Sequence, residues 1–439
     1  MAGPHYVWHA GSFTDGLSWA GAYATLKAAT DVAAAGEIIY VASDHVESAA
    51  STKTHTIAGT AALPVKILCA ARADTTLATG ASVTAGATSN NNFYGFAYIY
   101  GITFVAGSST STGMIIVGLS TGSTGIIFDN CLLKLGGTGA TAKIQLGSAA
   151  ASTSARDRYV VLKNTNLQFA AVGQTITPWA TVIWRGGSLV ASTYPTTLIT
   201  PVAAQPFDMT IAGCDVSGVT NIADLSVAAF GQLRLRNCKV PAAIACTGTY
   251  IGDGGTDVYL DNCDNGDVNY GMKHYHYRGT IETETTIVRT GGASDGTTPI
   301  SWKMVSAAES SYGFPLESPP ITIWNDSTAA LTVRIEIAQD SAAAALDNGE
   351  VWMEVEYPGT ASLPQSVFNV SSRGGNILAP GTTDHAASAA AWGGTTPTEQ
   401  YIITGSITPT QKGPIRARVM LAKPSTTLYV DPVLTIAAV

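Results

Sequence analysis

The chain has 439 residues, a length that suits two domains or one elongated repeat structure better than a single ordinary core. Charged residues make up only 12%, the formal net charge is -8, and the 23 lysines and arginines form no basic run, so we expect no nucleic-acid partner. The first ten residues, MAGPHYVWHA, contain neither a basic nor an apolar signal-peptide region, and no run of about 18 apolar residues follows, so we expect neither secretion nor a membrane partner.

The first predicted element is a short helix over about residues 25–35. This segment is rich in alanine, and Gly36, a typical C-cap residue, follows it. At helical spacing its apolar residues share one face: Leu26, Ala29, Val32 and Ala33. The next residues, EIIYVA, are typical of a strand. We expect the helix to cap the open edge of a sheet, because an uncovered edge invites pairing with other chains.

Short β-branched segments then recur, separated by Gly, Asn and Thr. They are PVKILCA (64–70), IYGITFVAG (99–107), GIIFDNCLLKL (125–135), YVVLKNTNLQF (159–169), DMTIAGCDV (208–216), QLRLRNCKV (232–240) and DVYLDNCDN (257–265). Aligned on the Cys or Thr at 131, 165, 214, 238 and 263, they lie 34, 49, 24 and 25 residues apart. No helical pattern lies between them, so parallel strands require the chain to wind as a solenoid. We predict a parallel β-helix over residues 1–278. The 49 residues between Thr165 and Cys214 are expected to form two coils.

The same Asn and Cys positions return in successive segments. An Asn tolerates the left-handed backbone of a coil corner and can bond to the Asn one coil above, while Cys is small enough to pack inside the coil. The six cysteines form no C-x-x-C pair, which favours buried free thiols. The predicted structural ladder comprises Asn130, Asn164, Asn237, Asn262, Cys131, Cys214, Cys238 and Cys263.

Residues 11–48, GSFTDGLSWAGAYATLKAATDVAAAGEIIYVASDHVES, resemble the first segment of right-handed parallel β-helix proteins of the pectin-lyase-like superfamily. A Gly/Asp turn, a Trp, a Thr-Leu helix and a Gly-acid-x-Ile-Tyr-Val strand follow in that order. IYGITFVAG is similar to a generic coil of these proteins. The resemblance implies the fold, but the superfamily includes lyases, hydrolases, adhesins and phage appendages, so it leaves the function open.

The composition changes after about residue 270. Residues 279–295 combine charges with a Gly/Ser/Thr/Pro stretch and are expected to form a connector. From 296 to 439 apolar and polar residues alternate, which predicts an antiparallel β-sandwich of jelly-roll type with one buried and one wet face. The clearest alternation sets Val333, Ile335 and Ile337 against Arg334, Glu336 and Ala338.

This C-terminal part also resembles a known module. The segments TPISWKMVSAAESSYGFPLESPPITIWND, EVWMEVEYPGT and YVDPVLTI are similar to the C-terminal module of structural proteins of tailed bacteriophages and prophages, where it is also joined to a β-helix. The resemblance implies a virion protein.

The sequence shows no clear catalytic pair. A glycosidase needs two neighbouring carboxyl groups. The residues that precede the repeated Asn are Asp129, Lys163, Arg236 and Asp261. Neighbouring coils would set Arg236 beside Asp261, which makes an exposed ion pair and no acid pair. We assign no catalytic residue.

Two segments are weak candidates for a metal site. Asp253 and Asp257 belong to GDGGTDVYLDNCDNGD, whose oxygen atoms could hold Ca²⁺, although Asp beside Gly and Asn is also typical of tight turns. His274 and His276 in KHYHYR would share one face of a strand, as half of a metal site or as part of an aromatic junction. No third ligand is visible, and we expect no metal and no cofactor.

These observations predict a non-enzymatic structural protein of a bacteriophage virion, a homotrimer assembled in the bacterial host cytoplasm. The expected position is capsid decoration, docked through the C-terminal sandwich onto the major capsid protein or another virion protein. The alternative is a tail spike or fibre that binds or depolymerises a host surface glycan. That alternative needs an acid pair or an aromatic groove, and Trp179 and Trp184 are the only such aromatic pairing in the sequence.

Overall fold

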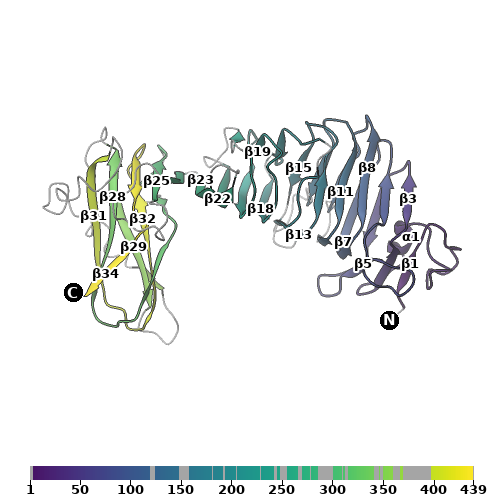
Figure 1. Cartoon of the computed structure of the whole chain (residues 1–439), viewed down its shortest axis with the longest axis horizontal. Helices are drawn as coiled ribbons and strands as arrows, with labels where there is room; N and C mark the ends of the chain where they lie inside the picture. The colour runs from purple at the N-terminus through teal and green to yellow at the C-terminus, as the bar shows by residue number, and fades with distance from the viewer. Residues whose placement is uncertain are drawn as a thin grey trace. The chain divides into compact units, whose positions relative to one another are not determined.

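The computed structural model of the chain divides into two compact units, Met1–Asn269 and Tyr270–Val439 (Figure 1). It describes residues 3–118, 124–147, 158–179, 181–190, 193–203, 205–227, 229–241, 245–247, 255–264, 269–276, 278–284, 300–308, 310–311, 315–340, 346, 350–358, 366–368 and 397–438.

Three parallel sheets run along the first unit. Sheet A contains, in spatial order, β1 (His5–Val7), β2 (Ile38–Ala42), β5 (Val65–Ala70), β7 (Asn91–Tyr100), β10 (Thr124–Asp129), β13 (Arg158–Lys163), β16 (Thr181–Arg185), β18 (Pro206–Ala212), β20 (Phe230–Arg236) and β22 (Thr256–Asp264). Sheet B contains β3 (Val46–Ala49), β6 (Ser82–Ala85), β8 (Thr103–Ser109), β11 (Leu132–Gly137) and β14 (Asn166–Gln168). Sheet C contains β4 (Lys53–Ile57), the first half of β7, β9 (Ile115–Val117), β12 (Lys143–Leu146), β15 (Thr175–Pro178), β17 (Thr197–Ile199), β19 (Asn221–Asp224) and β21 (Ala245–Thr247).

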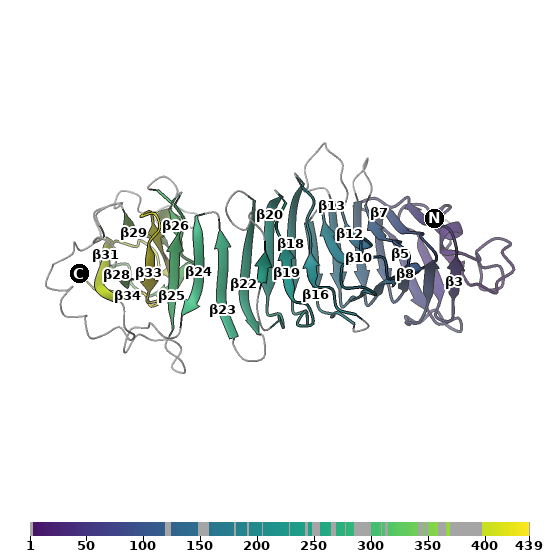
Figure 2. The same ribbon diagram turned by 90° about the horizontal axis from the view of Figure 1, so that it is seen from above.

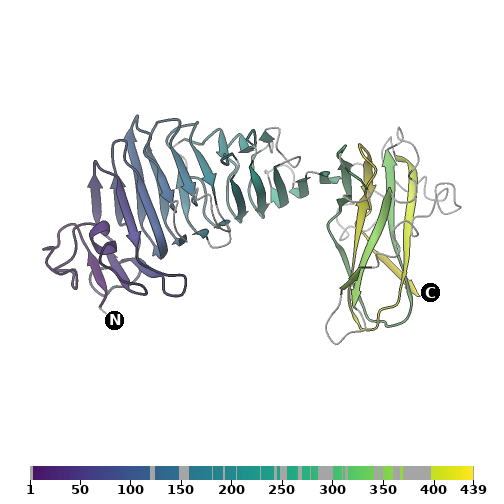
Figure 3. The ribbon, with the colours of Figure 1, turned by 180° about the vertical axis from the view of Figure 1, so that it is seen from behind.

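Each coil stacks on the one before it in register (Figures 2 and 3). Sheet B ends at β14, and in the later coils isolated bridges such as Ser188 with Asp215 and Asp215 with Lys239 continue this side. The chain therefore forms a parallel β-helix, and the interval of 49 residues does hold two coils, the additional one containing β16. Strand β7 belongs to two sheets, because it bends at Gly95 with φ 98°. The predicted all-β fold class with a parallel β-helix is confirmed.

Apolar side chains fill the inside of the coils. Phe93, Phe104 and Phe128 form an aromatic cluster with ring centroids 4.8 to 6.0 Å apart, and all three are fully buried. Inward and outward residues alternate along each strand, because side chains on a β-strand point to opposite faces. Along β10, Ile126 and Phe128 point inward, and Ile127 and Asp129 stand on the outer face.

The N-terminal helix is shorter than the predicted segment 25–35. Helix α1 spans Leu26–Thr30, with the Thr25 side chain accepting from the Ala28 amide and Asp31 as its C-cap. Val32, expected on the buried face, is 53% exposed because the helix has ended before it. The carboxylate of Glu47 accepts a hydrogen bond from the Leu26 amide at 2.8 Å and thereby ties the helix to the first coils.

The second unit consists of antiparallel strands in two sheets. The first sheet contains β23 (Asn269–His276), β24 (Gly279–Glu284), β25 (Ser301–Ser306), β33 (Thr427–Val430), β28 (Leu331–Asp340), β31 (Pro397–Ile407) and β34 (Thr435–Ala438). The second sheet contains β30 (Ser366–Phe368), β29 (Val351–Pro358), β32 (Gly413–Leu421), β26 (Leu316–Glu317) and β27 (Ile321–Asn325). The two sheets share one apolar core, to which Val333, Ile335 and Leu428 contribute from the first sheet and Val351 and Val419 from the second.

Two details of this unit differ from the sequence-based expectation. Residues 279–284, expected to open a connector, form β24 and pair with β25, whereas 285–299 lie outside the described residues. Glu336 and Ala338, expected on a wet face, are 7% and 0% exposed. The Arg334 guanidinium binds the Glu336 carboxylate at 2.8 Å, and β33 pairs with β28 at Ala338. The domain limits read from composition, and the likeness of this part to a phage module, stay predictions.

Candidate functional site

In the coils from β7 to β22, the chain leaves sheet A at a corner with a left-handed backbone. Asn130, Asn164, Asn237 and Asn262 occupy this corner with φ between 47° and 55°. The Asn262 amide donates to the Asn237 amide oxygen at 2.7 Å, across two stacked coils. The Asn130 amide instead donates to the Tyr100 hydroxyl at 3.5 Å.

Glycines hold the same corner in three other coils. Strand register places Gly101, Gly186 and Gly213 at equivalent positions, with φ of 75°, 67° and 61°. The alignment on Cys and Thr includes the coil of Gly213 through Cys214, but not the coils of Gly101 and Gly186, where Ile102 and Gly187 follow the corner. A glycine adopts this conformation without the Asn that marks the other corners. The sequence signal for these corners is a glycine directly after each β-branched segment, as at Gly101, Gly186 and Gly213.

The cysteines lie one position beyond the corner and point inward. Cys131, Cys214, Cys238 and Cys263 are at most 4% exposed, and none of these four forms a disulfide. Their sulfur atoms contact backbone carbonyls, such as that of Asp129 at 3.4 Å from Cys131. Burial raises the pKa of the Cys131 and Cys214 thiols to about 12, so both stay protonated and unreactive at neutral pH.

The outer face of sheet A gathers the polar and aromatic side chains that could meet a ligand. Strand register sorts these side chains into three rows. The corner row is Tyr100, Asp129, Lys163, Arg185, Ala212, Arg236 and Asp261. The middle row is Tyr98, Ile127, Val161, Ile183, Thr210, Arg234 and Tyr259. The far row is Phe96, Gly125, Tyr159, Thr181, Asp208, Gln232 and Asp257.

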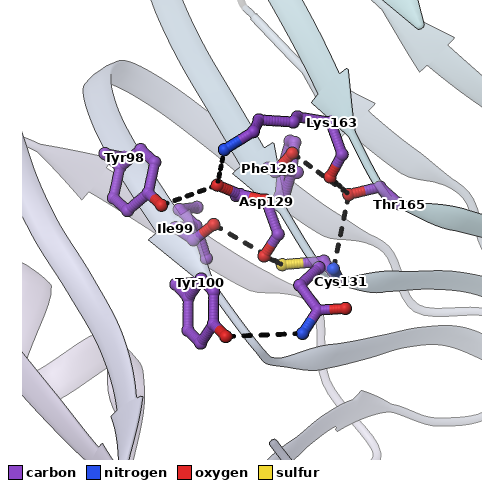
Figure 4. A network of polar contacts seen from close by, with 9 residues as sticks. Tyr98, Ile99, Tyr100, Phe128, Asp129, Cys131, Lys163 and Thr165 are labelled. Carbon is purple, nitrogen blue, oxygen red and sulfur yellow. Dashed lines mark hydrogen bonds and ion pairs between the residues drawn. The ribbon is translucent and has the colours of Figure 1, made fainter. Parts of the chain in front are cut away.

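Asp129 is the centre of a polar network that links three coils (Figure 4). The Tyr98 hydroxyl donates to Asp129 Oδ2 at 2.7 Å, and the Lys163 ammonium contacts the same oxygen at 2.7 Å. Asp129 is only 4% exposed, and its carboxylate is balanced by the Lys163 charge. Burial, followed by the hydrogen bond to Asp129, raises the pKa of Tyr98. The network fixes the Tyr98 ring on the outer face.

Aromatic rings stand on either side of this network. Tyr100 and Tyr159 are half-buried, and Phe96 lies across Gly125 from Tyr159 with ring centroids 6.5 Å apart. A Cβ on Gly125 would come within 2.6 Å of both rings, so this glycine allows the two aromatic side chains to meet. The face therefore offers half-exposed ring surfaces beside charged groups. The sequence pointed to Trp179 and Trp184 as the aromatic pairing, and these rings are those of tyrosine and phenylalanine instead. Trp184 is fully buried and donates its indole hydrogen to the Thr165 carbonyl, so it belongs to the core.

Cations of the corner row lie farther along the same face. The Arg236 guanidinium lies 3.6 Å from the Asp261 carboxylate, which is the ion pair that the sequence predicts. Arg185 is exposed and stands in register between Lys163 and Ala212. Within the part of the chain that the structure describes, no ion pair joins Arg185 to a carboxylate.

Three of the four weak metal candidates lie within the described residues. Asp253 lies outside the described residues, and Asp257 accepts a hydrogen bond from the Tyr259 hydroxyl at 3.4 Å. His274 and His276 lie on β23, where the His276 ring accepts from the Arg278 amide at 3.2 Å. Among the described residues, no three His, Cys, Asp or Glu side chains are placed to hold one metal ion. No helix in the described ranges is both long and apolar enough to cross a membrane.

Comparison with known proteins gives no family. No protein-family model matches the sequence, and no curated protein matches it. Among solved structures, the enzymatically active domain of tailspike protein 4 of bacteriophage CBA120 is similar at 10% sequence identity, over 96% of this chain and 67% of that chain, with a TM-score of 0.20. Tailspike protein gp49 of Acinetobacter baumannii bacteriophage Fri1, a capsular polysaccharide depolymerase, is similar at 9% identity, over 90% of this chain and 69% of that chain, with a TM-score of 0.22.

Both of these proteins are named as enzymes. The expectation that this chain is not an enzyme is contradicted by them, and we do not retain it. Both are also tailspike proteins, and neither is a capsid decoration protein. With TM-scores of 0.20 and 0.22, the architecture described above rests on the strand pairings of this chain alone.

Proposed function

We propose that this chain is a bacteriophage virion protein of the tail-spike type, which binds a host surface polysaccharide on the outer face of sheet A. The observation that carries the proposal is the register of that face. It sets half-exposed aromatic rings and hydrogen-bonding side chains side by side on consecutive coils, at a spacing of about 4.8 Å per coil.

The chemistry of the face suits a carbohydrate chain. Tyrosine combines a flat apolar ring with a polar tip, so Tyr100 and Tyr159 can contact both the C–H and the O–H groups of a sugar. The Asp129 network holds Tyr98 in place before a ligand arrives, which lowers the entropy lost on binding. A polysaccharide that runs along the stacked coils would meet the same kind of surface from one coil to the next.

The sequence resemblance to pectin-lyase-like β-helices and to a module of phage structural proteins supports a place on the virion. The proposal includes a homotrimer, whose mass in solution would be three times the 45.2 kDa of the chain. It takes the tail as the position, because ligand-binding chemistry on an outer face suits contact with the host surface. Labelling of purified particles with an antibody against this chain should mark the tail, and label confined to the capsid would contradict that position.

Binding is tested with the full-length protein on immobilised capsular and O-antigen polysaccharides from a panel of bacterial strains. We expect at least one polymer to bind, and Tyr159→Ala to weaken that binding roughly tenfold. Tyr94→Ala is the matched control, because Tyr94 is half-buried like Tyr159. Tyr94 lies in the first half of β7, which pairs in sheet C and not in sheet A. Equal losses in both variants would show that the outer face of sheet A is not the binding surface.

The same samples are assayed for cleavage. New reducing ends indicate hydrolysis of the polymer, and unsaturated products indicate a lyase reaction. Binding to no member of the panel would contradict the proposed function.

A further inference from the structure

Among the described residues, one cation of the corner row has no carboxylate partner. Lys163 is bound to Asp129, and Arg236 lies beside Asp261. Arg185 stands between them in register, is exposed, and forms no ion pair with a carboxylate of the described residues. An exposed arginine loses little by staying solvated, so this observation alone decides nothing.

The surroundings of Arg185 leave its guanidinium open to a ligand. Gly186 follows it at the corner, and Ala212 and Gly213 hold the equivalent positions of the next coil. A Cβ built on Gly213 would meet no atom within 4 Å. On this side, therefore, no large side chain separates Arg185 from solvent or from Arg236, which lies two coils away at roughly 10 Å, twice the strand spacing.

Two acids of the corner row, Asp129 and Asp261, pair with Lys163 and Arg236, and the other acids of the face stand away from Arg185. The acids Asp208 and Asp257 stand in the far row, four residues earlier on their strands than the corner row and so about 13 Å from it. This distance exceeds the Debye length of about 8 Å at physiological ionic strength, so these carboxylates do little to neutralise Arg185. The corner row keeps a positive centre although the whole chain carries a net charge of -8.

We propose that the polysaccharide bound on the outer face of sheet A is anionic, and that a carboxylate of an acidic sugar unit pairs with Arg185, with Arg236 as the second contact. The inference rests on the proposed function and names its ligand class. A guanidinium fits a carboxylate with two parallel hydrogen bonds, which an ammonium cannot reproduce. An acidic polymer repeats its charge at regular intervals, as the coils repeat their corner positions.

The experiment uses the full-length chain and pairs each acidic polysaccharide of the panel with its own carboxyl-reduced form, in which the backbone is unchanged and the charge is gone. We expect binding to acidic members only, a loss of about tenfold or more on carboxyl reduction, and weaker binding as salt is raised. Arg185→Ala should cause a loss of similar size, and Arg185→Lys should restore only part of it. Lys134→Ala, which removes a cation from the outer side of sheet B, should change nothing.

The outcomes separate the two proposals. Binding to a neutral polymer, or binding that survives carboxyl reduction or Arg185→Ala without loss, would overturn the anionic ligand while the proposed function stands. Binding to phosphorylated but not to carboxylated polymers would overturn the carboxylate as the partner of Arg185. Absence of binding to every polymer would overturn both the ligand class and the proposed function.

Discussion

The two units of the molecule bring residues together over very different distances along the chain. In the β-helix, bonded side chains lie about one coil apart, such as Asn237 and Asn262 at 25 residues or Tyr98 and Asp129 at 31. In the second unit, the Ser306 hydroxyl bonds to the Lys423 carbonyl across 117 residues. The first kind of contact follows from an interval that repeats in the sequence. The second kind depends on a long chain closing, which costs more conformational entropy and leaves no periodic trace.

The largest expected effect comes from the bend that β7 makes between two sheets. Gly95→Ala would place a Cβ 2.0 Å from the Ile57 carbonyl oxygen at a φ of 98°, so we expect a loss of about 5 kcal/mol in the stability of the β-helix. Thermal unfolding of the full chain measures the loss, and hydrogen exchange assigns it to the unit. Gly213→Ala is the control: its φ is 61° but no atom lies nearby, so it should cost only about 1–2 kcal/mol. Equal losses in the two variants would show that the positive φ, and not the contact of the new Cβ with the Ile57 carbonyl oxygen, determines the cost of the substitution.

The buried Glu47 should have the next largest effect. Burial would raise the pKa of this carboxyl, but hydrogen bonds from His45 and Lys53 and from the Leu26 amide outweigh burial and lower the pKa from 4.5 to about 2. A lowered pKa in the folded state means that the carboxylate stabilises the fold above about pH 4.5 and that this contribution disappears as the pH falls towards 2. Glu47→Gln should cost about 3 kcal/mol at pH 7 and flatten the pH dependence of the melting temperature between those values. A variant with an unchanged acid slope would exclude Glu47 as the titrating group.

In the second unit, Ser306 provides the corresponding test of a distant contact. Its hydroxyl accepts from the Thr426 amide at 2.9 Å and is buried, so Ser306→Ala should destabilise this unit by about 2 kcal/mol. Hydrogen exchange should increase in β25 and β33 and stay unchanged in the coils. Thr322→Ala, on the exposed side of β27, should leave exchange as it is. Faster exchange in the coils of the Ser306 variant would show that the two units do not open independently.

The smallest effect is expected at the exposed corner. Asn262 holds φ 49°, so Asn262→Ala should cost about 1 kcal/mol, whereas Asn262→Gly should change stability by less than about 0.5 kcal/mol. Chemical denaturation of the β-helix measures both. A larger loss in the glycine variant would mean that the bond to Asn237 contributes more than the backbone conformation does.

The sequence revealed the β-helix because the corner chemistry repeats. Asn followed by Cys marked three coils, and register then set Arg236 beside Asp261, as observed at 3.6 Å. The interval of 49 residues predicted the coil that contains Arg185 but did not locate its corner, where Gly186 and Gly187 replace the repeated pair. The residue on which the ligand proposal depends was therefore absent from the alignment.

Other features were hidden for physical reasons. The contact of Tyr98 with Asp129 crosses two positions along the strand as well as one coil, so alignment on the corner alone does not predict it. Alternation along β28 predicted which side faces the core, but not that Glu336 would be buried beside Arg334. Such burial depends on neighbours far away in the chain. Helix α1 ends at Thr30 because Asp31 is its C-cap. The spacing of apolar residues, from which the helix was predicted, does not show where such a cap lies.

The left-handed corner has a consequence for how such a molecule can change over generations. Since the coils from β7 to β22 meet through the same corner and the same strand register, duplication or deletion of one whole coil there would leave the remaining contacts intact. Lineages can thus lengthen or shorten the outer face in modular steps, and the stretch of polymer it spans would change by the same increment.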